Sequence, residues 1–578
     1  MEENQWNVKL RDQRRRSRGA LDLRIFCFTI LLSLGAVLFL LFSLMVFRES
    51  FRPILIVPRI SSSSAMAMSA RDSRSNNNGG SHPPLKLYDQ VVFPDHVLLI
   101  IHQNRVPTLN THQLSCLYEH KLEVPSEILT LPVLSIDRDD ESNLQIARCP
   151  LPPTSYSHPR LTSMANKPEG ERSDDGDEER SVKLSEEVSP PHWETLVYEA
   201  MTDGDSVVVF AKGLNLRPDR ASDPAQFLCV FGWNLSKPKF IFTTKAITAA
   251  QEVIRCSLPL SIKTKPSKSE GITVSIKTQT RGILASVAKL KNQNKHRREK
   301  PTYKHTMCVC TMLWNQAQFL KEWIMYHAEL GVSRWFIYDN NSDDGIEEVL
   351  GPLRQAYNVT RRTWPWLKTQ EAGFSHCAVQ AQRECKWVGF MDVDEFFYLP
   401  STSHSEGPPL IGILNEQAKE VGEVRTSCHS FGPSGHRRAP SKGVTVGYTC
   451  RLGSPERHKS IVRPRALDRA LINVVHHFHL KPGFVFVDLP RGVAVINHYK
   501  YQVWDVFKAK FYRRVATYVA DWHDKEREGS KDRAPGLGTE AVEPPNWAQQ
   551  FCEVLDTGLR DYVMGRFMDT ETRLLPWE

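Results

Sequence analysis

The stretch Trp387–Tyr398, WVGFMDVDEFFY, decides the fold, because it is an apolar run that is interrupted by three acids. The apolar part predicts a buried strand. Side chains alternate along a strand, so Asp392 and Asp394 are expected to point to the same side where the strand ends. Two carboxylates at the carboxyl end of a parallel strand suit Mg²⁺ or Mn²⁺, which prefer oxygen ligands. The alternative is a strand that runs out into a solvated acidic turn.

The residues before this stretch alternate between the patterns of strands and helices. This alternation implies an α/β fold with a parallel sheet and right-handed crossovers, in which ligands bind at the carboxyl ends of the strands. Asn315, the loop Asp339–Gly345 and the Asp392–Asp394 pair are therefore expected to converge. The predicted strands are 307–313, 334–339, 359–366 and 386–391, and the predicted helices are 317–330, 346–356 and 370–384.

Residues 25–47 form an uncharged, almost wholly apolar run of 23 residues, which is long enough to cross a bilayer as a helix. Seven Lys and Arg residues precede the run and few charges follow it. The positive-inside rule then places residues 1–24 in the cytosol and the rest of the chain in the lumen or outside. No signal-peptide cleavage site follows the run. We expect a single-pass type II membrane protein.

The composition limits the class of protein further. A chain of 578 residues is too long for one core, so several domains are expected. The net charge of +8 is modest and no dense basic stripe is present, so nucleic acid is not an expected partner. Eleven of the twelve cysteines follow the apolar run, where disulfides can form. Acceptor sequons at Asn234, Asn340 and Asn358 fit a secretory glycoprotein.

The expected organisation after the span begins with a stem over 48–85 and a β-rich accessory domain over 86–290. This domain carries an acidic insertion near 153–190. It also contains a weak internal repeat, which predicts one disulfide per copy: Cys116–Cys149 and Cys229–Cys256. Free buried thiols are the alternative. The role of the domain, glycan binding or spacing, stays open. An α/β domain over 303–520 and a tail over 521–578 complete the chain.

Four motifs, taken in order, resemble glycosyltransferase family 92. They are Met307–Gln316, Glu322–His327, Tyr338–Asp344 and Phe390–Phe396, and the resemblance covers about residues 303–518. Plant members with an amino-terminal β domain include the galactan synthases, which add galactose from UDP-galactose to pectic β-1,4-galactan in the Golgi. The resemblance implies a GT-A fold, a UDP-sugar donor, a cell-wall or other glycan acceptor, an inverting transfer, and a lumenal catalytic domain in the Golgi.

The resemblance also implies a metal site for Mn²⁺ or Mg²⁺, which would bridge the two phosphates of the donor. Asp394 is the expected direct ligand, while Asp392 would hold the ribose or a metal-bound water and Glu395 would brace the turn. A further ligand in GT-A enzymes is often a distant His. His498 is the first choice, because it matches a His-Tyr motif of the family; the rivals are His476, His477 and His479.

Other residues are expected to hold the donor or to activate the acceptor. Asn315 and Asp339 would contact the donor, and Asp339 would hold uracil or ribose unless it forms an Asx turn or a helix cap. Lys459 would contact the phosphates unless it belongs to a solvated charge run. An inverting transfer needs a carboxylate base, for which Glu456 and Asp468 are candidates. Trp364, Trp366 and Phe431 would stack on sugar rings or pack in the core.

Two other classes of function compete with this hypothesis. The first is a phosphatase or phosphotransferase with an aspartyl nucleophile, whose motif usually carries Thr or Val where this chain has Phe396. The second is a non-catalytic glycan-binding or scaffold protein, against which the intact Asp392, Asp394 and His498 argue. The oligomeric state, homo- or hetero-oligomer, is left open.

Overall fold

The structure is a computed structural model. None of the predicted cytosolic tail, membrane span or stem lies in the part of the chain that it describes, and most of the acidic insertion also lies outside that part. Among the described helices, none combines the length and the apolar composition needed to cross a membrane. The described residues are 86–578 except 103–110, 122–126, 143, 164–188, 236–240, 292–302, 401–407, 475 and 518–542.

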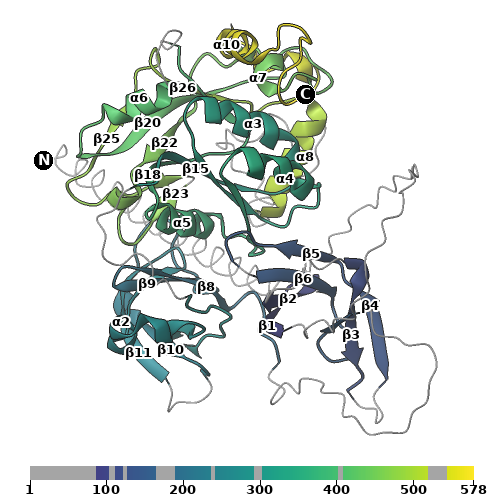
Figure 1. The fold of residues 1–578 in the computed structure, drawn as a ribbon, viewed down its shortest axis with the longest axis vertical. Helices are drawn as coiled ribbons and strands as arrows, with labels where there is room; N and C mark the ends of the chain where they lie inside the picture. The colour runs from purple at the N-terminus through teal and green to yellow at the C-terminus, as the bar shows by residue number, and fades with distance from the viewer. Residues whose placement is uncertain are drawn as a thin grey trace, which may run out of the picture. The chain divides into compact units, whose positions relative to one another are not determined.

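The predicted α/β arrangement is present. Four parallel strands lie in the order β17-β16-β15-β18, which is the order of the first four strands of a doubly wound sheet. Figure 1 shows β15 and β18 side by side. The ligand crevice of such a sheet lies at the switch point, here between β15 and β18. The strands are β15 (His305–Leu313), β16 (Arg334–Asp339), β17 (Val359–Thr363) and β18 (Cys385–Phe390), and the helices are α3 (Ala317–Glu329), α4 (Ile346–Ala356) and α5 (Gln370–Ala381).

The element boundaries follow the sequence pattern closely, with one difference of physical interest. The third strand was predicted over 359–366, but β17 ends at Thr363. Pro365 has no amide hydrogen to give to a sheet, so the ladder stops before it.

The alternation along β15 separates two hydrophobic cores. Met307 and Val309 belong to the core that contains α3 and α4, whereas Cys308 and Cys310 face the core that contains α5. The sheet is thus covered by helices on both faces, as expected for a parallel sheet (Figure 1).

Antiparallel and mixed strands extend the sheet beyond β18. β22 pairs antiparallel with β18 and with β20, and β26 pairs with β20 and with β19. This extension places segments from late in the chain beside the acids that follow β18. Its strands are β19 (Glu395–Tyr398), β20 (Val421–Ser430), β22 (Arg457–Val462), β25 (Val485–Asp488) and β26 (Val495–His498).

The region before the α/β part is built from strands, in two groups. The first group forms a four-stranded sheet, β1-β2-β6-β5, and a three-stranded sheet, β4-β3-β7, and the second forms a seven-stranded sheet from β8 to β14. The strands of the first group are β1 (Lys86–Val92), β2 (His96–His102), β3 (Leu114–Glu119), β4 (Ile128–Pro132), β5 (Ser135–Arg138), β6 (Leu144–Pro150) and β7 (Arg160–Ser163). Those of the second are β8 (Leu196–Asp203), β9 (Ser206–Lys212), β10 (Phe227–Gly232), β11 (Ile241–Ala250), β12 (Val253–Ser257), β13 (Thr273–Thr278) and β14 (Gly282–Ile283).

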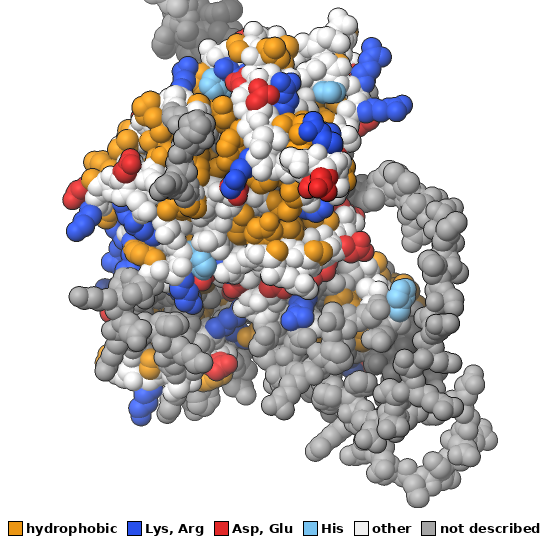
Figure 2. All heavy atoms as spheres, turned by 45° about the horizontal axis from the view of Figure 1, so that its top comes forward, with side chains coloured by type: hydrophobic (Ala, Val, Ile, Leu, Met, Phe, Trp, Pro, Cys, Tyr) orange, Lys and Arg blue, Asp and Glu red, His pale blue; other side chains and the backbone are white. Residues whose placement is uncertain are grey.

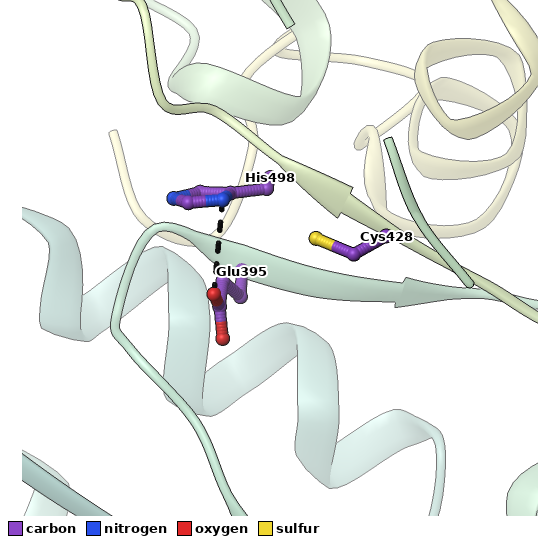
Figure 3. Close-up of side chains that lie close together, drawn as sticks. All are labelled: Glu395, Cys428 and His498. Atoms are coloured by element: carbon purple, nitrogen blue, oxygen red, sulfur yellow. Dashed lines mark ion pairs between the residues drawn. The ribbon is translucent and has the colours of Figure 1, made fainter. Parts of the chain in front are cut away.

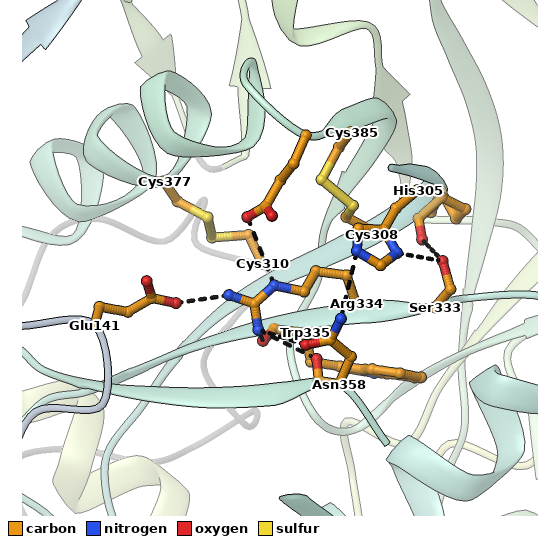
Figure 4. The surroundings of a disulfide bond; sticks show 12 residues. Glu141, His305, Cys308, Cys310, Ser333, Arg334, Trp335, Asn358, Cys377 and Cys385 are labelled. Carbon is orange, nitrogen blue, oxygen red and sulfur yellow. Dashed lines mark hydrogen bonds and ion pairs between the residues drawn. A yellow bond between two sulfur atoms is a disulfide. The ribbon is translucent and has the colours of Figure 1, made fainter. Parts of the chain in front are cut away.

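Both predicted disulfides, Cys116–Cys149 and Cys229–Cys256, are present. Each bond lies in one of the two groups of strands, as the repeat suggested. Three further disulfides were not predicted from the sequence: Cys308–Cys385, Cys310–Cys377 and Cys450–Cys552. Two of them tie β15 to β18 and to α5, as Figure 4 shows.

The carboxyl-terminal residues complete the core of the α/β part. Leu559 and Val563 of α10 (Gly558–Phe567) and Leu575 are buried in the same core as α3. Cys552 ties this segment to Cys450. The helix α8 (Trp504–Thr517) precedes it and follows directly on β26 in the chain order of the described helices and strands.

Candidate active site

The two acids of the motif lie on a tight turn between β18 and β19. β18 ends at Phe390, two residues before Asp392, so the turn, and not alternation along a strand, sets the direction of these side chains. The two acids still face the same cavity, as predicted. The Glu395 amide donates to the Asp392 carbonyl (3.1 Å), and the Asp392 amide donates to the Glu395 carboxylate (3.1 Å). These two bonds fix the turn, and both acids line one cavity.

Asp392 has two basic partners. Its Oδ2 atom lies 3.5 Å from His476 Nε2 and 3.7 Å from Lys459 Nζ. Lys459, on β22, also lies 2.7 Å from Glu395 Oε1. Burial would raise the pKa of Asp392, but His476 and Lys459 outweigh that effect and hold the pKa well below its usual range. Burial would likewise lower the pKa of Lys459, but Glu395 and Asp392 raise it.

Asp394 has a second, separate pair of partners. Its Oδ2 atom accepts a hydrogen bond from Lys510 Nζ (2.5 Å) and lies 3.6 Å from His498 Nε2. Antiparallel pairing of Glu395 with His498 across β19 and β26 brings this histidine to the turn. Burial would raise the pKa of Asp394, but Lys510 and His498 lower it. Asp394 is therefore ionised at neutral pH.

The acids open into a cavity of about 280 Å³. Its wall is formed by the ends of β15 and β18, by β22 and by α8, so it lies at the switch point of the sheet. The charged side chains of the wall give a small excess of positive charge, which suits an anionic ligand. They are five cations, Lys368, Arg457, Lys459, Lys500 and Lys510, and four carboxylates, Asp392, Asp394, Glu395 and Glu456.

The donor atoms beside Asp394 fit a divalent cation. Asp394 Oδ2 and His498 Nε2 are 3.6 Å apart, a separation that one cation can bridge with bonds of about 2.1 Å. Glu395 and Cys428 offer further atoms: Figure 3 shows both beside His498, and the ligand atoms of these three lie within 4.8 Å of one another. Burial raises the pKa of the Cys428 thiol, so Asp394 and His498 are the better ligands for a hard cation.

The structure separates the two candidates for the catalytic base. Glu456 lines the cavity, where its Oε2 atom accepts hydrogen bonds from Ser430 Oγ (2.6 Å) and Lys500 Nζ (3.0 Å). Burial would raise the pKa of Glu456, but these two partners lower it, so the carboxylate is ionised. Asp468 lines a different cavity, of about 250 Å³, and caps the Ala470 amide (2.8 Å).

The residues predicted to hold the donor are only partly brought to the cavity. Lys459 lies in its wall, but Asn315 and Asp339 do not, although their neighbours Trp314, Gln316 and Asn340 do. Asn315 exchanges hydrogen bonds with Asp343, and Asp339 is buried in an ion pair with Arg361 (2.6 Å). Asp339 Oδ1 also accepts the Ser342 amide (2.9 Å), three residues on, so the side chain holds its own loop, although the spacing is not that of an Asx turn.

Several other residues take positions that the sequence did not settle. Of the three rival histidines, His476 reaches Asp392 and His477 lines the same cavity, whereas His479 is not part of its wall. Trp364, Trp366 and Phe431 are all buried, in keeping with core packing rather than sugar stacking. Lys510 and Lys500 were missed, because a single lysine on a helix or after a strand carries no sequence signal of its own.

Comparison with known proteins identifies the family. The sequence model of glycosyltransferase family 92 matches residues 303–532. A family 92 protein of Ricinus communis is 50% identical over 92% of this chain and 90% of its own length. A family 92 protein of Arabidopsis thaliana is 51% identical over the same shares. A galactan beta-1,4-galactosyltransferase of Arabidopsis thaliana is 27% identical over 26% of this chain and 34% of its own.

Likeness to solved structures is weak. The crystal structure of S. aureus TarS, residues 1–349, is 12% identical and covers 34% of this chain and 60% of its own, with a TM-score of 0.24. Glucosyl-3-phosphoglycerate synthase from Mycobacterium tuberculosis is 14% identical and covers 28% of this chain and 58% of its own, with a TM-score of 0.17. TM-scores this low support no conclusion about the site. The identity to the curated relatives over nearly the whole chain is decisive, and the chain belongs to glycosyltransferase family 92.

Proposed function

We propose that this protein is a metal-dependent inverting glycosyltransferase with a GT-A-like domain. It moves a hexose, galactose in the first instance, from a UDP-sugar to a cell-wall or other glycan acceptor. The observation that carries the proposal is the ionised Asp394 beside His498, in a cavity at the switch point of a doubly wound sheet. A nucleoside diphosphate is anionic, and the cavity wall has more cationic than anionic side chains.

The roles of the residues follow from their positions. Asp394 and His498 would hold Mn²⁺ or Mg²⁺, and Asp392 would hold the ribose or a metal-bound water. When bound, the cation neutralises charge on the departing UDP. Glu456 is the base that takes the proton of the acceptor hydroxyl, because it is the candidate carboxylate in the cavity, and Lys500 keeps it ionised.

Galactose as the sugar and a glycan as the acceptor are proposed from similarity over a smaller part of the chain than the similarity that identifies the family. It is supported by the local similarity to the galactan galactosyltransferase and by the resemblance of the four motifs. The location proposed is the Golgi, with residues 25–47 as a type II anchor and the catalytic domain in the lumen. On the face drawn in Figure 2, basic and acidic side chains of the described residues lie interspersed, which does not favour nucleic acid as the partner.

The test is transfer by the purified full-length chain. It is incubated with a panel of UDP-sugars and Mn²⁺, with and without galactan oligosaccharides. The comparison is with Asp394→Asn and with Glu420→Gln, a matched change of an exposed carboxylate outside the cavity. We expect oligosaccharide elongation with UDP-galactose, lost with a chelator and in Asp394→Asn but kept in Glu420→Gln.

Two other outcomes are informative. Metal-dependent hydrolysis of another UDP-sugar would keep the class of enzyme and overturn galactose as the donor. A folded sample that neither binds nor hydrolyses any donor would contradict the proposal and favour a non-catalytic glycan-binding or scaffold protein.

A further inference from the structure

Lys510 occupies the place of a cation between two predicted metal ligands. Its Nζ atom lies 2.5 Å from Asp394 Oδ2 and 3.4 Å from His498 Nε2, and these two atoms are themselves 3.6 Å apart. The three atoms therefore form a compact triangle with the ammonium group close to both ligand atoms. A divalent cation bound to the same two atoms would lie within a few ångströms of that ammonium, so the two charges would repel.

The ligands are fixed, whereas the lysine is able to move. The Asp394 carbonyl accepts the Tyr499 amide (2.9 Å), and His498 is held in the β19–β26 ladder. The side chains of Asp394 and His498 are 3% and 16% exposed, but that of Lys510 is 32% exposed. Four rotatable bonds let such a side chain withdraw without any change of the backbone.

Lys459 shows what a fixed cation in this cavity looks like. Its side chain is 8% exposed and lies between Glu395 (2.7 Å) and Asp392 (3.7 Å). Among the described residues its ion-pair partners are these two carboxylates, and to leave the turn it would have to break both ion pairs. Lys510 forms an ion pair with one carboxylate among the described residues, that of Asp394, and its side chain is partly exposed to solvent. It is therefore the cation that a metal can replace.

We propose that Lys510 is a resident counter-cation that a divalent metal must displace from Asp394. The displaced ammonium then takes a phosphate oxygen of the donor, so that metal and nucleotide diphosphate bind cooperatively. This inference rests on the proposed function for the identity of the donor, but its first half, competition for Asp394, concerns the protein and the metal alone. Coupling of this kind is reciprocal: a metal that helps the nucleotide to bind is itself bound more tightly with the nucleotide.

The test measures Mn²⁺ binding directly, by electron paramagnetic resonance of free Mn²⁺, on the full-length chain without any donor. Lys510→Met removes the competing charge, and Lys508→Met changes an exposed lysine of the same helix as the matched control. We expect Lys510→Met to tighten Mn²⁺ binding about tenfold, within the usual range for coupled sites. Lys508→Met should match the unmodified chain, and Asp394→Asn should lose the site.

A second titration tests the coupling. UDP should tighten Mn²⁺ binding strongly in the unmodified chain and much less in Lys510→Met, because the variant has no displaced ammonium for the phosphates. Should Lys510→Met unfold more readily, Mn²⁺ is expected to raise its Tm by more than that of the unmodified chain, since tighter binding stabilises more.

The proposal is overturned if Lys510→Met leaves Mn²⁺ affinity unchanged or weakens it. It is also overturned if none of the variants binds Mn²⁺ while UDP binding depends on Lys510, which would make the lysine a permanent replacement for the metal. That last result would also remove the metal dependence from the proposed function, whereas an Mn²⁺ affinity that Lys510→Met leaves unchanged or weakens is compatible with metal-dependent transfer, so the two failures can be told apart.

Discussion

At the level of single residues, each of the two aspartates of the motif has a lysine and a histidine beside it, and Asp392 shares its lysine with Glu395. Asp392 has Lys459 and His476, and Asp394 has Lys510 and His498. The sequence predicted the two aspartates, and it offered both histidines as alternatives for a single position as metal ligand. It could not assign them to different acids, because that choice depends on how β26 and the β23–β24 hairpin (Asn473–Val474 and His477–Phe478) approach the turn.

We expect Glu456 to be essential for transfer and Asp468 to be dispensable for it. Glu456→Gln keeps the shape and hydrogen bonding of the side chain but removes the base, so we expect transfer to fall by about 100-fold or more. Binding of UDP-sugar should hardly change. Steady-state kinetics and donor titration of both variants check this, with Asp468→Asn as the comparison. Equal losses in the two variants would contradict the assignment.

Lys459 is expected to stabilise the fold by balancing a buried carboxylate. Lys459→Met leaves Glu395, whose side chain is fully buried, without its cation, which should cost about 3–5 kcal/mol of unfolding free energy. The double variant with Glu395→Gln should recover part of this loss, because no buried charge then remains unpaired. Urea denaturation of the two single variants and the double variant measures the coupling, and strictly additive losses would speak against it.

At the level of elements, the strands and helices of the α/β part were predictable because their apolar periodicities are strong. Strand β16 and helix α4 lie where the sequence placed them. The extension of the sheet by β22, β20, β26 and β19 was not predicted, since short strands paired across long sequence distances leave little local pattern. Without that extension, neither the positions of the histidines nor that of Glu456 can be deduced.

The contact between α3 and β19 predicts a dependence of stability on pH. His327 of α3 is fully buried, its Nδ1 lies 2.8 Å from the Trp323 carbonyl, and its Nε2 accepts the Phe397 amide (3.3 Å). Burial lowers its pKa from 6.5 to about 4. The unfolded chain therefore binds the proton more readily than the folded chain. The contribution of His327 leaves the free energy of unfolding undiminished above pH 6.5 and lowers it as the pH drops toward 4, by up to about 3 kcal/mol.

The measurement is the free energy of unfolding at several values of pH between 4 and 7, for the unmodified chain and for His327→Gln. The variant will be less stable overall, because the buried hydrogen bonds change. Its slope against pH should nevertheless be smaller, since it lacks the titrating group. Parallel curves would show that His327 does not contribute.

At the level of the whole molecule, the accessory region and the α/β part share side-chain contacts. Trp366 stacks with Trp193 (ring centroids 5.5 Å apart), and one hydrophobic core contains residues of both parts. Arg361 of β17 lies 2.7 Å from Asp137 of β5 and 2.6 Å from Asp339. The sequence predicted the β-rich composition of the region and its two disulfides, but charges 224 residues apart gave no indication that they would meet.

Arg361 is expected to couple the two parts during unfolding. Arg361→Met leaves the buried Asp339 without its cation, at a cost of about 3–5 kcal/mol, whereas Asp137 keeps its ion pair with Arg148. Arg361→Lys keeps the charge but cannot serve both carboxylates in one plane, so an intermediate loss is expected. Calorimetry should show a lower Tm and a broadened or split transition in Arg361→Met. A single sharp transition at the original Tm would contradict the coupling.

Two of the unpredicted disulfides, Cys308–Cys385 and Cys310–Cys377, have a consequence for how the acidic turn is supported. Cys308 ties β15 to β18, which leads into the acidic turn, and Cys310 ties the same face of β15 to α5. Before those bonds close, β15, β18 and α5 are held together by the β15–β18 ladder and by packing. Oxidation is thus expected to stabilise the strand and the helix beneath the acids, and this part of a chain kept reduced should unfold more readily.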